Sequence, residues 1–88
     1  MTRFAYLDRN VQAMFVQGLT DAKAGFPAFA WFEHGKLWAM GHRTLTRRVV
    51  RYPMGPTDNA REYREARAYA RAYQAIRPGF TVADLPNR

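Results

Sequence analysis

The sequence predicts an α+β fold: a helix, a three-stranded antiparallel sheet and a second helix (αβββα), with both helices on one face of the sheet. Near both ends of the chain, apolar residues recur at three- and four-residue spacing, which is typical of amphipathic helices. Between them, three runs rich in aromatic and β-branched residues are separated by turn residues, as strands are. The 88 residues are 48% hydrophobic, enough for one domain with a single modest core.

The first helix is predicted from an apolar stripe that is expected to be buried. The stripe comprises Phe4, Leu7, Val11, Met14, Phe15, Gly18, Leu19 and Ala22. The start is left open between residues 2 and 9, because Asp8 and Asn10 could both cap the helix. Residues 4–7 could instead form a short strand. The end is expected near Ala24, since a glycine and then a proline follow. Gly18 costs the helix about 1 kcal/mol relative to alanine, which indicates close approach to another element.

Three strands are predicted next. Residues 28–33 (AFAWFE) and 36–42 (KLWAMGH) are rich in aromatic side chains, and His34-Gly35 between them indicates the tight turn of a hairpin. Residues 43–52 (RTLTRRVVRY) are rich in Thr and Val and predict a third strand. Its alternation is imperfect, so part of it could be an edge that faces solvent. The prolines and glycine of residues 53–56 (PMGP) are expected to end the sheet.

The second helix is predicted over residues 58–77. At 100° per residue, its aromatic and alanine side chains gather between about 60° and 200°. This tyrosine face comprises Tyr63, Ala66, Tyr69, Ala70, Tyr73 and Ile76. Thr57 or Asp58 is expected to cap the start, because either side-chain oxygen can accept a hydrogen bond from a free N–H group. Pro78-Gly79 is expected to stop the helix.

The expected core joins the tyrosine face and the stripe of the first helix to the aromatic residues of the hairpin. Trp38 and either Trp31 or Phe29 are expected to be buried there. We expect the domain to cover residues 1–79. Residues 80–88 then form a short C-terminal tail, whose apolar residues could pack back on the core. These residues are Phe80, Val82 and Leu85.

The net charge of +7 is unevenly placed along the chain. Residues 1–35 sum to zero, residues 36–77 carry the whole excess, and residues 78–88 are balanced. Such asymmetry favours acidic partners. Twelve of the fourteen basic residues are arginines, which suit bidentate contacts with phosphates and base edges. A GC-rich genome would also favour arginine.

The candidate site is a basic nucleic-acid-binding surface on the third strand and the second helix. It comprises Arg43, Arg47, Arg48, Arg51, Arg61, Arg64, Arg67 and Arg71, with Tyr52. On the helix, Arg61 can pair with Glu65, whereas the other three arginines have no acid three or four residues away. Three tyrosines are interleaved with these arginines and could stack on bases, namely Tyr52, Tyr63 and Tyr69. The alternative is a solvated arginine face with the tyrosines mostly in the core.

The element order is similar to that of double-stranded RNA-binding domains, as is the local pair Ala68-Tyr69. A three-stranded sheet with one helix also occurs in AP2-type and integrase arm-binding domains. The loop histidine motif and the lysine-rich helix start of the RNA-binding family are absent, since residues 55–62 read GPTDNARE. The resemblance therefore extends to the order of elements, and it assigns neither a family nor site residues.

Other chemistry has weaker signals. The chain has no cysteine, which excludes disulfides and thiolate metal sites. Near arginines, His42 could act as the acid-base group of a small ribonuclease-like toxin, but no second proton-transfer group is evident. Glu33, His34 and His42 form at most a weak metal-binding set. We therefore expect no catalytic residues, no metal and no cofactor.

The expected function is that of a small, non-enzymatic DNA- or RNA-binding protein, such as a regulator from a phage or mobile element. The main alternative is a protein-interaction module that docks its arginine face on an acidic protein surface. A phage inhibitor of a host nucleic-acid machine, including an anti-CRISPR type, belongs to that class. We expect a cytoplasmic protein without a membrane segment, and a homodimer is a further option. The sequence leaves open whether the partner is DNA, RNA or protein.

Overall fold

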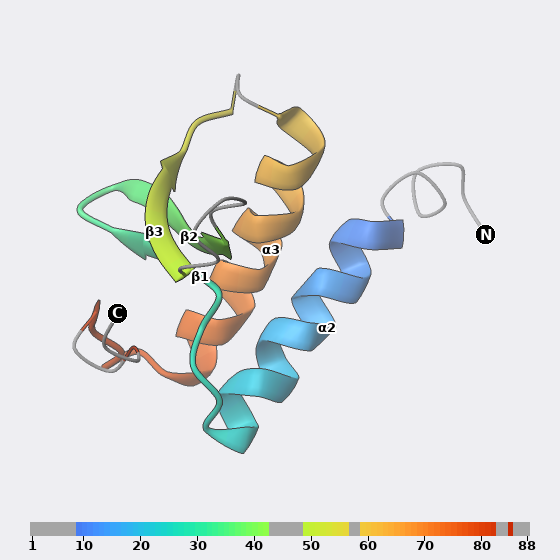
Figure 1. Ribbon diagram of the computed structural model, residues 1–88. Helices are drawn as coiled ribbons and strands as arrows, with labels where there is room; N and C mark the ends of the chain where they lie inside the picture. The colour runs from blue at the N-terminus through green and yellow to red at the C-terminus, as the bar shows by residue number, and fades with distance from the viewer. Residues whose placement is uncertain (1–8, 43–48, 57–58, 83–84, 86–88) are drawn as a thin grey trace.

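The computed structural model describes residues 9–42, 49–56, 59–82 and 85, and it confirms the α+β fold (Figure 1). The elements are α2 (Arg9–Ala24), β1 (Ala30–Glu33), β2 (Lys36–His42), β3 (Val49–Met54) and α3 (Ala60–Ile76). The first helix ends at Ala24, as predicted. The question of strand or helix over residues 1–7 lies outside the described residues.

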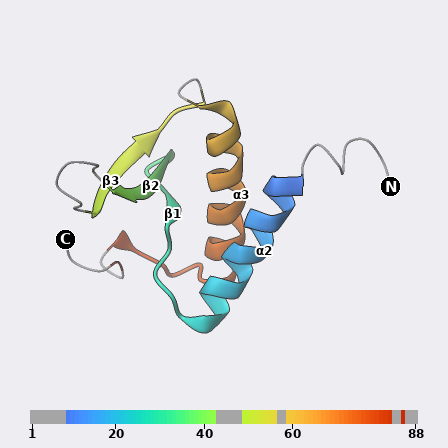
Figure 2. The same ribbon diagram turned by 45° about the vertical axis from the view of Figure 1, so that its right-hand side comes forward.

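The helix α3 is the centre of the fold. It contacts β1 and β2 on one side and α2 on another (Figures 1 and 2). Both helices lie on the same side of the sheet, as predicted, and they run parallel to each other. However, α3 covers the sheet, while α2 packs mainly on α3. The fold is thus a sheet, a central helix and an outer helix.

Gly18 explains how closely the two helices approach each other. A Cβ atom at this position would collide with the carbonyl oxygen of Tyr69 and come within 3.0 Å of the Cβ of Ala72. The close approach that the sequence indicated is therefore confirmed. Only the absent side chain lets α2 lie directly on the backbone of α3.

The hairpin of β1 and β2 has the predicted turn. His34 and Gly35 both have positive φ, at 53° and 78°, as a two-residue type I′ turn requires. Glu33 pairs with Lys36 directly across this turn. The hairpin and the following strand form one antiparallel sheet in the order β1-β2-β3.

The third strand runs two residues further than predicted, through Pro53 to Met54. Pro53 lies opposite Trp38, whose other partner is Trp31. The hydrogen-bonding groups of Trp38 point toward β1, because Met40 donates to Phe29 at the equivalent position two residues away. The nitrogen of Pro53 therefore faces the open edge of the sheet, where no N–H group is needed.

The core is built around Trp31, Leu37, Tyr69 and Tyr73, the largest fully buried side chains. Trp31 is the more buried of the two expected alternatives, whereas Trp38 is only half-buried. Phe80 and Leu85 of the tail pack against the core, as predicted. The rings of Trp31 and Phe80 lie 6.4 Å apart between centroids.

The cap of α3 differs from the prediction. The side chain of Asn59 accepts a hydrogen bond from the backbone N–H of Glu62 at 3.1 Å, which makes Asn59 the N-cap. Thr57 and Asp58 lie outside the described residues. The helix begins at Ala60, two residues later than predicted, and ends at Ile76, just before Pro78.

Candidate nucleic-acid interface

The helix α3 presents one exposed basic side. Arg64, Arg67 and Arg71, called the arginine row below, are all exposed. At 100° per residue they point away from the arc that faces the sheet and α2. Ala68 and Ala72 on the adjoining arc are buried, and Ala72 faces Gly18 of α2. The row therefore lies on a side of the helix that the fold leaves to solvent.

The tyrosine face serves the core instead. The hydroxyl of Tyr69 donates a 2.5 Å hydrogen bond to the carboxylate of Asp21, and that of Tyr73 donates one of the same length to the carbonyl of Phe26. Burial raises the pKa of Tyr69 above its usual value, and the hydrogen bond to Asp21 adds to this. Tyr69 is 0% exposed, so the expectation that it could stack on bases is wrong.

The arginines of the row are spaced three and four residues apart, over about 10 Å of helix axis. Within the part of the chain that the structure describes, no carboxylate forms an ion pair with any of them. Arg61, one turn before the row, pairs with Glu65 at 3.4 Å, as predicted. Repulsion between neighbouring arginines of the row costs a few tenths of a kcal/mol per pair. Three cations are thus held together without internal neutralisation.

Of the predicted strand residues, the structure describes Arg51 and Tyr52, and neither extends this row. Tyr52 pairs with Ala39, a buried residue on the face that α3 covers, whereas Arg51 pairs with Met40. Because side chains alternate along a strand, Arg51 lies on the sheet face that points away from α3. Arg43, Arg47 and Arg48 lie outside the described residues.

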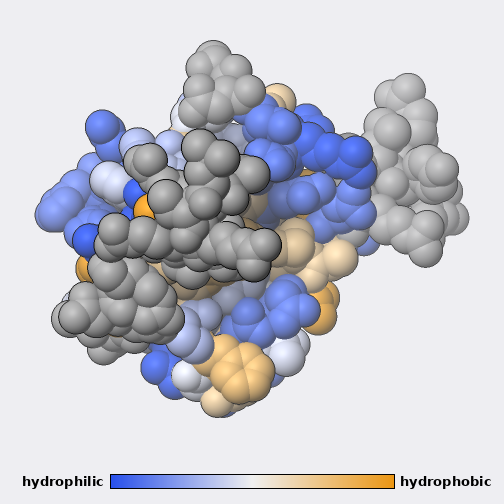
Figure 3. Space-filling model, in the orientation of Figure 1, coloured by the Kyte–Doolittle hydropathy of each residue, from blue (hydrophilic) through white to orange (hydrophobic). Residues whose placement is uncertain are grey.

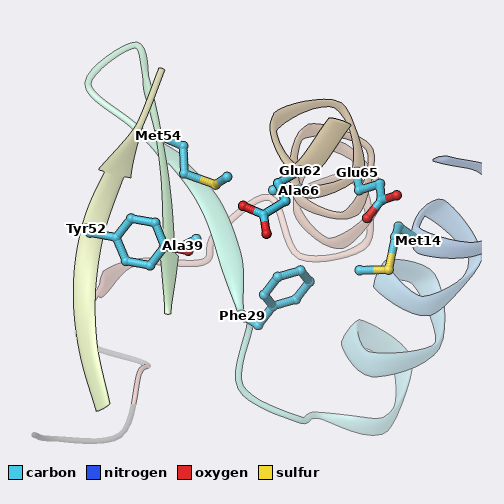
Figure 4. A pocket seen from close by; sticks show the side chains of 8 residues that line it. All are labelled: Met14, Phe29, Ala39, Tyr52, Met54, Glu62, Glu65 and Ala66. Atoms are coloured by element: carbon cyan, nitrogen blue, oxygen red, sulfur yellow. The ribbon is translucent and has the colours of Figure 1, made fainter. Parts of the chain in front are cut away.

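Tyr52 lines a groove of about 200 Å³ between β3 and α3 (Figure 4). Its floor is largely apolar, and the side chains of Glu62 and Glu65 enter it from α3. Tyr52 is 40% exposed, but in Figure 4 the carboxylate of Glu62 points toward it from α3 and would repel a phosphate placed beside its ring. The groove and the arginine row are therefore electrostatically distinct surfaces.

The helix α2 carries an exposed apolar surface that its sequence pattern did not predict. Phe15 is 43% exposed and Val16 is 58% exposed, although Phe15 belongs to the stripe that was expected to be buried. Figure 3 shows further hydrophobic surface low in the view, near the end of α2, where Phe26 is 57% exposed. Met14 and Phe15 are adjacent, so they cannot both point at α3. That adjacency is the signal that could have identified Phe15.

The described residues give little support to the hypotheses of a catalytic histidine or a metal site. His34 is an exposed turn residue, and the side chain of His42 lies outside the description. Among the described residues, no group of three potential metal ligands occurs. The helices in these same residues are too short or too polar to cross a bilayer.

Comparison with protein-family models, with curated proteins and with solved structures found no match for this chain.

Proposed function

We propose that this protein binds the phosphate backbone of a nucleic acid through the arginine row of α3. The observation that carries the proposal is the row itself: three exposed guanidinium groups on one helix face, unpaired by any described carboxylate. The row is not needed for packing, since the other sides of α3 meet the sheet and α2. Arginine forms strong, bidentate hydrogen bonds with phosphate oxygens.

The dimensions of the row suit a nucleic-acid backbone. Its axial length of about 10 Å corresponds to roughly three base steps of 3.4 Å along one strand. Each phosphate that an arginine neutralises releases condensed counterions, so affinity must fall as salt rises. Binding through this row alone carries no base recognition, because phosphate contacts position a nucleic acid without reading its sequence.

The test compares two variants that each lose two positive charges. Arg67→Ala/Arg71→Ala removes two members of the row, while Lys23→Ala/Lys36→Ala removes two exposed lysines at the end of α2 and the start of β2. Fluorescence anisotropy with labelled duplex DNA, duplex RNA and single strands is measured over a range of salt concentrations. We expect the row variant to make the slope of log affinity against log salt shallower by about 2, and the lysine variant to leave the slope nearly unchanged.

Equal losses in the two variants would mean that net charge, and not the row, holds the nucleic acid. No binding by the wild type at low salt would remove the proposal altogether. The alternative of an acidic protein surface would then be preferred, because an acidic protein can neutralise the same three arginines.

A further inference from the structure

The position of Phe15 relative to the arginine row follows from the contact between α2 and α3. Gly18 contacts Tyr69 and Ala72, and the two helices run parallel. Phe15 comes one turn earlier on α2, so it lies about one turn before that contact, at the level of Ala68. Ala68 lies four residues after Arg64, at the level of the row.

The direction of Phe15 follows from the contacts of its neighbours. Viewed down the axis of α2, Asp21 and Phe15 lie about 60° to opposite sides of Gly18. Asp21 points to the inner side, because it accepts the hydrogen bond of the buried Tyr69. Phe15 therefore points to the outer side, which is the side on which α3 carries the arginine row. Its 43% exposure agrees with this placement.

We infer that this surface binds single-stranded nucleic acid, with a base stacked on Phe15 and the neighbouring phosphates held by Arg64 and Arg71. The inference rests on the proposed function and names its substrate class. Single-strand binding combines a basic track with an aromatic side chain on which an unpaired base can stack. In a duplex the bases are paired and stacked, so their faces cannot reach a ring on a helix surface.

Charge argues against a second copy of this chain as the occupant of the surface. A symmetric dimer brings the same patch of both subunits together. Here the patch includes the arginine row, so a dimer would place arginines against arginines. An anionic strand satisfies both the apolar and the cationic part of the surface.

The test uses a labelled 20-nucleotide oligo-dT strand and a labelled 20-base-pair duplex at one salt concentration. Phe15→Ala is expected to weaken binding of the single strand about 10-fold, as loss of one base stack does, and to leave duplex binding unchanged. Phe15→Trp keeps an aromatic face and should restore the affinity. Val16→Ala is the matched control, because Val16 is also exposed but points further from the row.

The row variant Arg67→Ala/Arg71→Ala separates the two proposals, since it should weaken binding of both probes. If it does so while Phe15→Ala binds the single strand like wild type, the inference is wrong and the proposed function stands. If Phe15→Ala weakens both probes equally, or if wild type prefers the duplex, stacking on Phe15 is also excluded. If neither probe binds wild type, both proposals fail. Circular dichroism of each variant confirms that the fold is retained.

Discussion

The two sides of α3 differ in how many of their side chains make specific contacts with the rest of the fold. On the inner side, Tyr69, Tyr73 and Gln74 each reach a specific partner in α2, the following loop or β1. No buried side-chain nitrogen or oxygen lacks a partner in the described part of the chain. On the outer side, the arginine row has no ion-pair partner among those same described residues, and its members repel one another. The contacts of the inner side stabilise the fold, which accounts for its residues. We therefore look for a function on the outer side.

The largest expected effect is on the inner contact of the two helices. Gly18→Ala places a Cβ against the backbone of Tyr69, which cannot move without shifting α3. We expect a loss of about 2–3 kcal/mol in the free energy of unfolding by urea, since overpacking outweighs the better helix propensity of alanine. Gly79→Ala is the control, because nothing lies within 4 Å of its added Cβ. Similar losses in both variants would contradict the close contact.

A smaller effect is expected from the hydroxyl of Tyr69. Tyr69→Phe removes its hydrogen bond to Asp21 and should lower the free energy of unfolding by about 1–2 kcal/mol at neutral pH. Tyr63→Phe serves as the matched control, since no hydrogen bond of its hydroxyl occurs among the described residues. If Tyr69→Phe proved as stable as wild type, the hydrogen bond would contribute nothing.

The same hydroxyl predicts a dependence on alkaline pH. The pKa of Tyr69 is raised above the ordinary 10.0, first by burial and then by Asp21. Above pH 10 the folded state keeps this proton while the unfolded state loses it, so stability is complete below about pH 10 and falls as pH rises. The expected slope is about 1.4 kcal/mol per pH unit for this group. Urea unfolding between pH 9 and 11 should show the fall in wild type and lack this contribution in Tyr69→Phe.

The smallest effect on stability is expected from the arginine row. Arg67→Ala/Arg71→Ala should unfold within about 0.5 kcal/mol of wild type, or slightly later at low salt, because repulsion is relieved. The variant should nevertheless bind nucleic acid more weakly, whereas Tyr69→Phe should bind it like wild type. This opposite pattern would separate the two sides of α3 by measurement. A row variant that lost more than 1 kcal/mol would show that the arginines also serve the fold.

Much of this architecture follows from local patterns. The 3.6-residue period of α3 places the tyrosines and the arginine row on different sides, and Gly18 indicates the helix contact. The sequence pattern did not predict Pro53 as a strand residue. Proline can lie in a strand only where its nitrogen faces an open edge, and the pairing with β2 decides that direction. It also assigned Phe15 to the core, since helical spacing does not say which of two adjacent apolar residues meets the partner helix.

The position of Arg51 and Tyr52 could not be predicted for a related reason. Successive residues of a strand point to opposite faces, and the sequence does not say which face α3 will cover. The register with β2 decides this, by placing Tyr52 opposite the buried Ala39. Strand and helix were expected to form a single basic surface. Arg51 does not belong to it, because the sheet lies between Arg51 and the arginine row.

Gln74 has a consequence for how the sheet can grow. Its side-chain amide donates to the carbonyl of Phe32 at 3.1 Å and accepts from the N–H of Phe32 at 2.9 Å, as a neighbouring strand would. An incoming strand would have to displace this amide to pair with β1, while on the edge of β3 the nitrogen of Pro53 offers it no N–H group. Both described edge strands therefore carry a feature that opposes edge-to-edge growth of the sheet into a fibre.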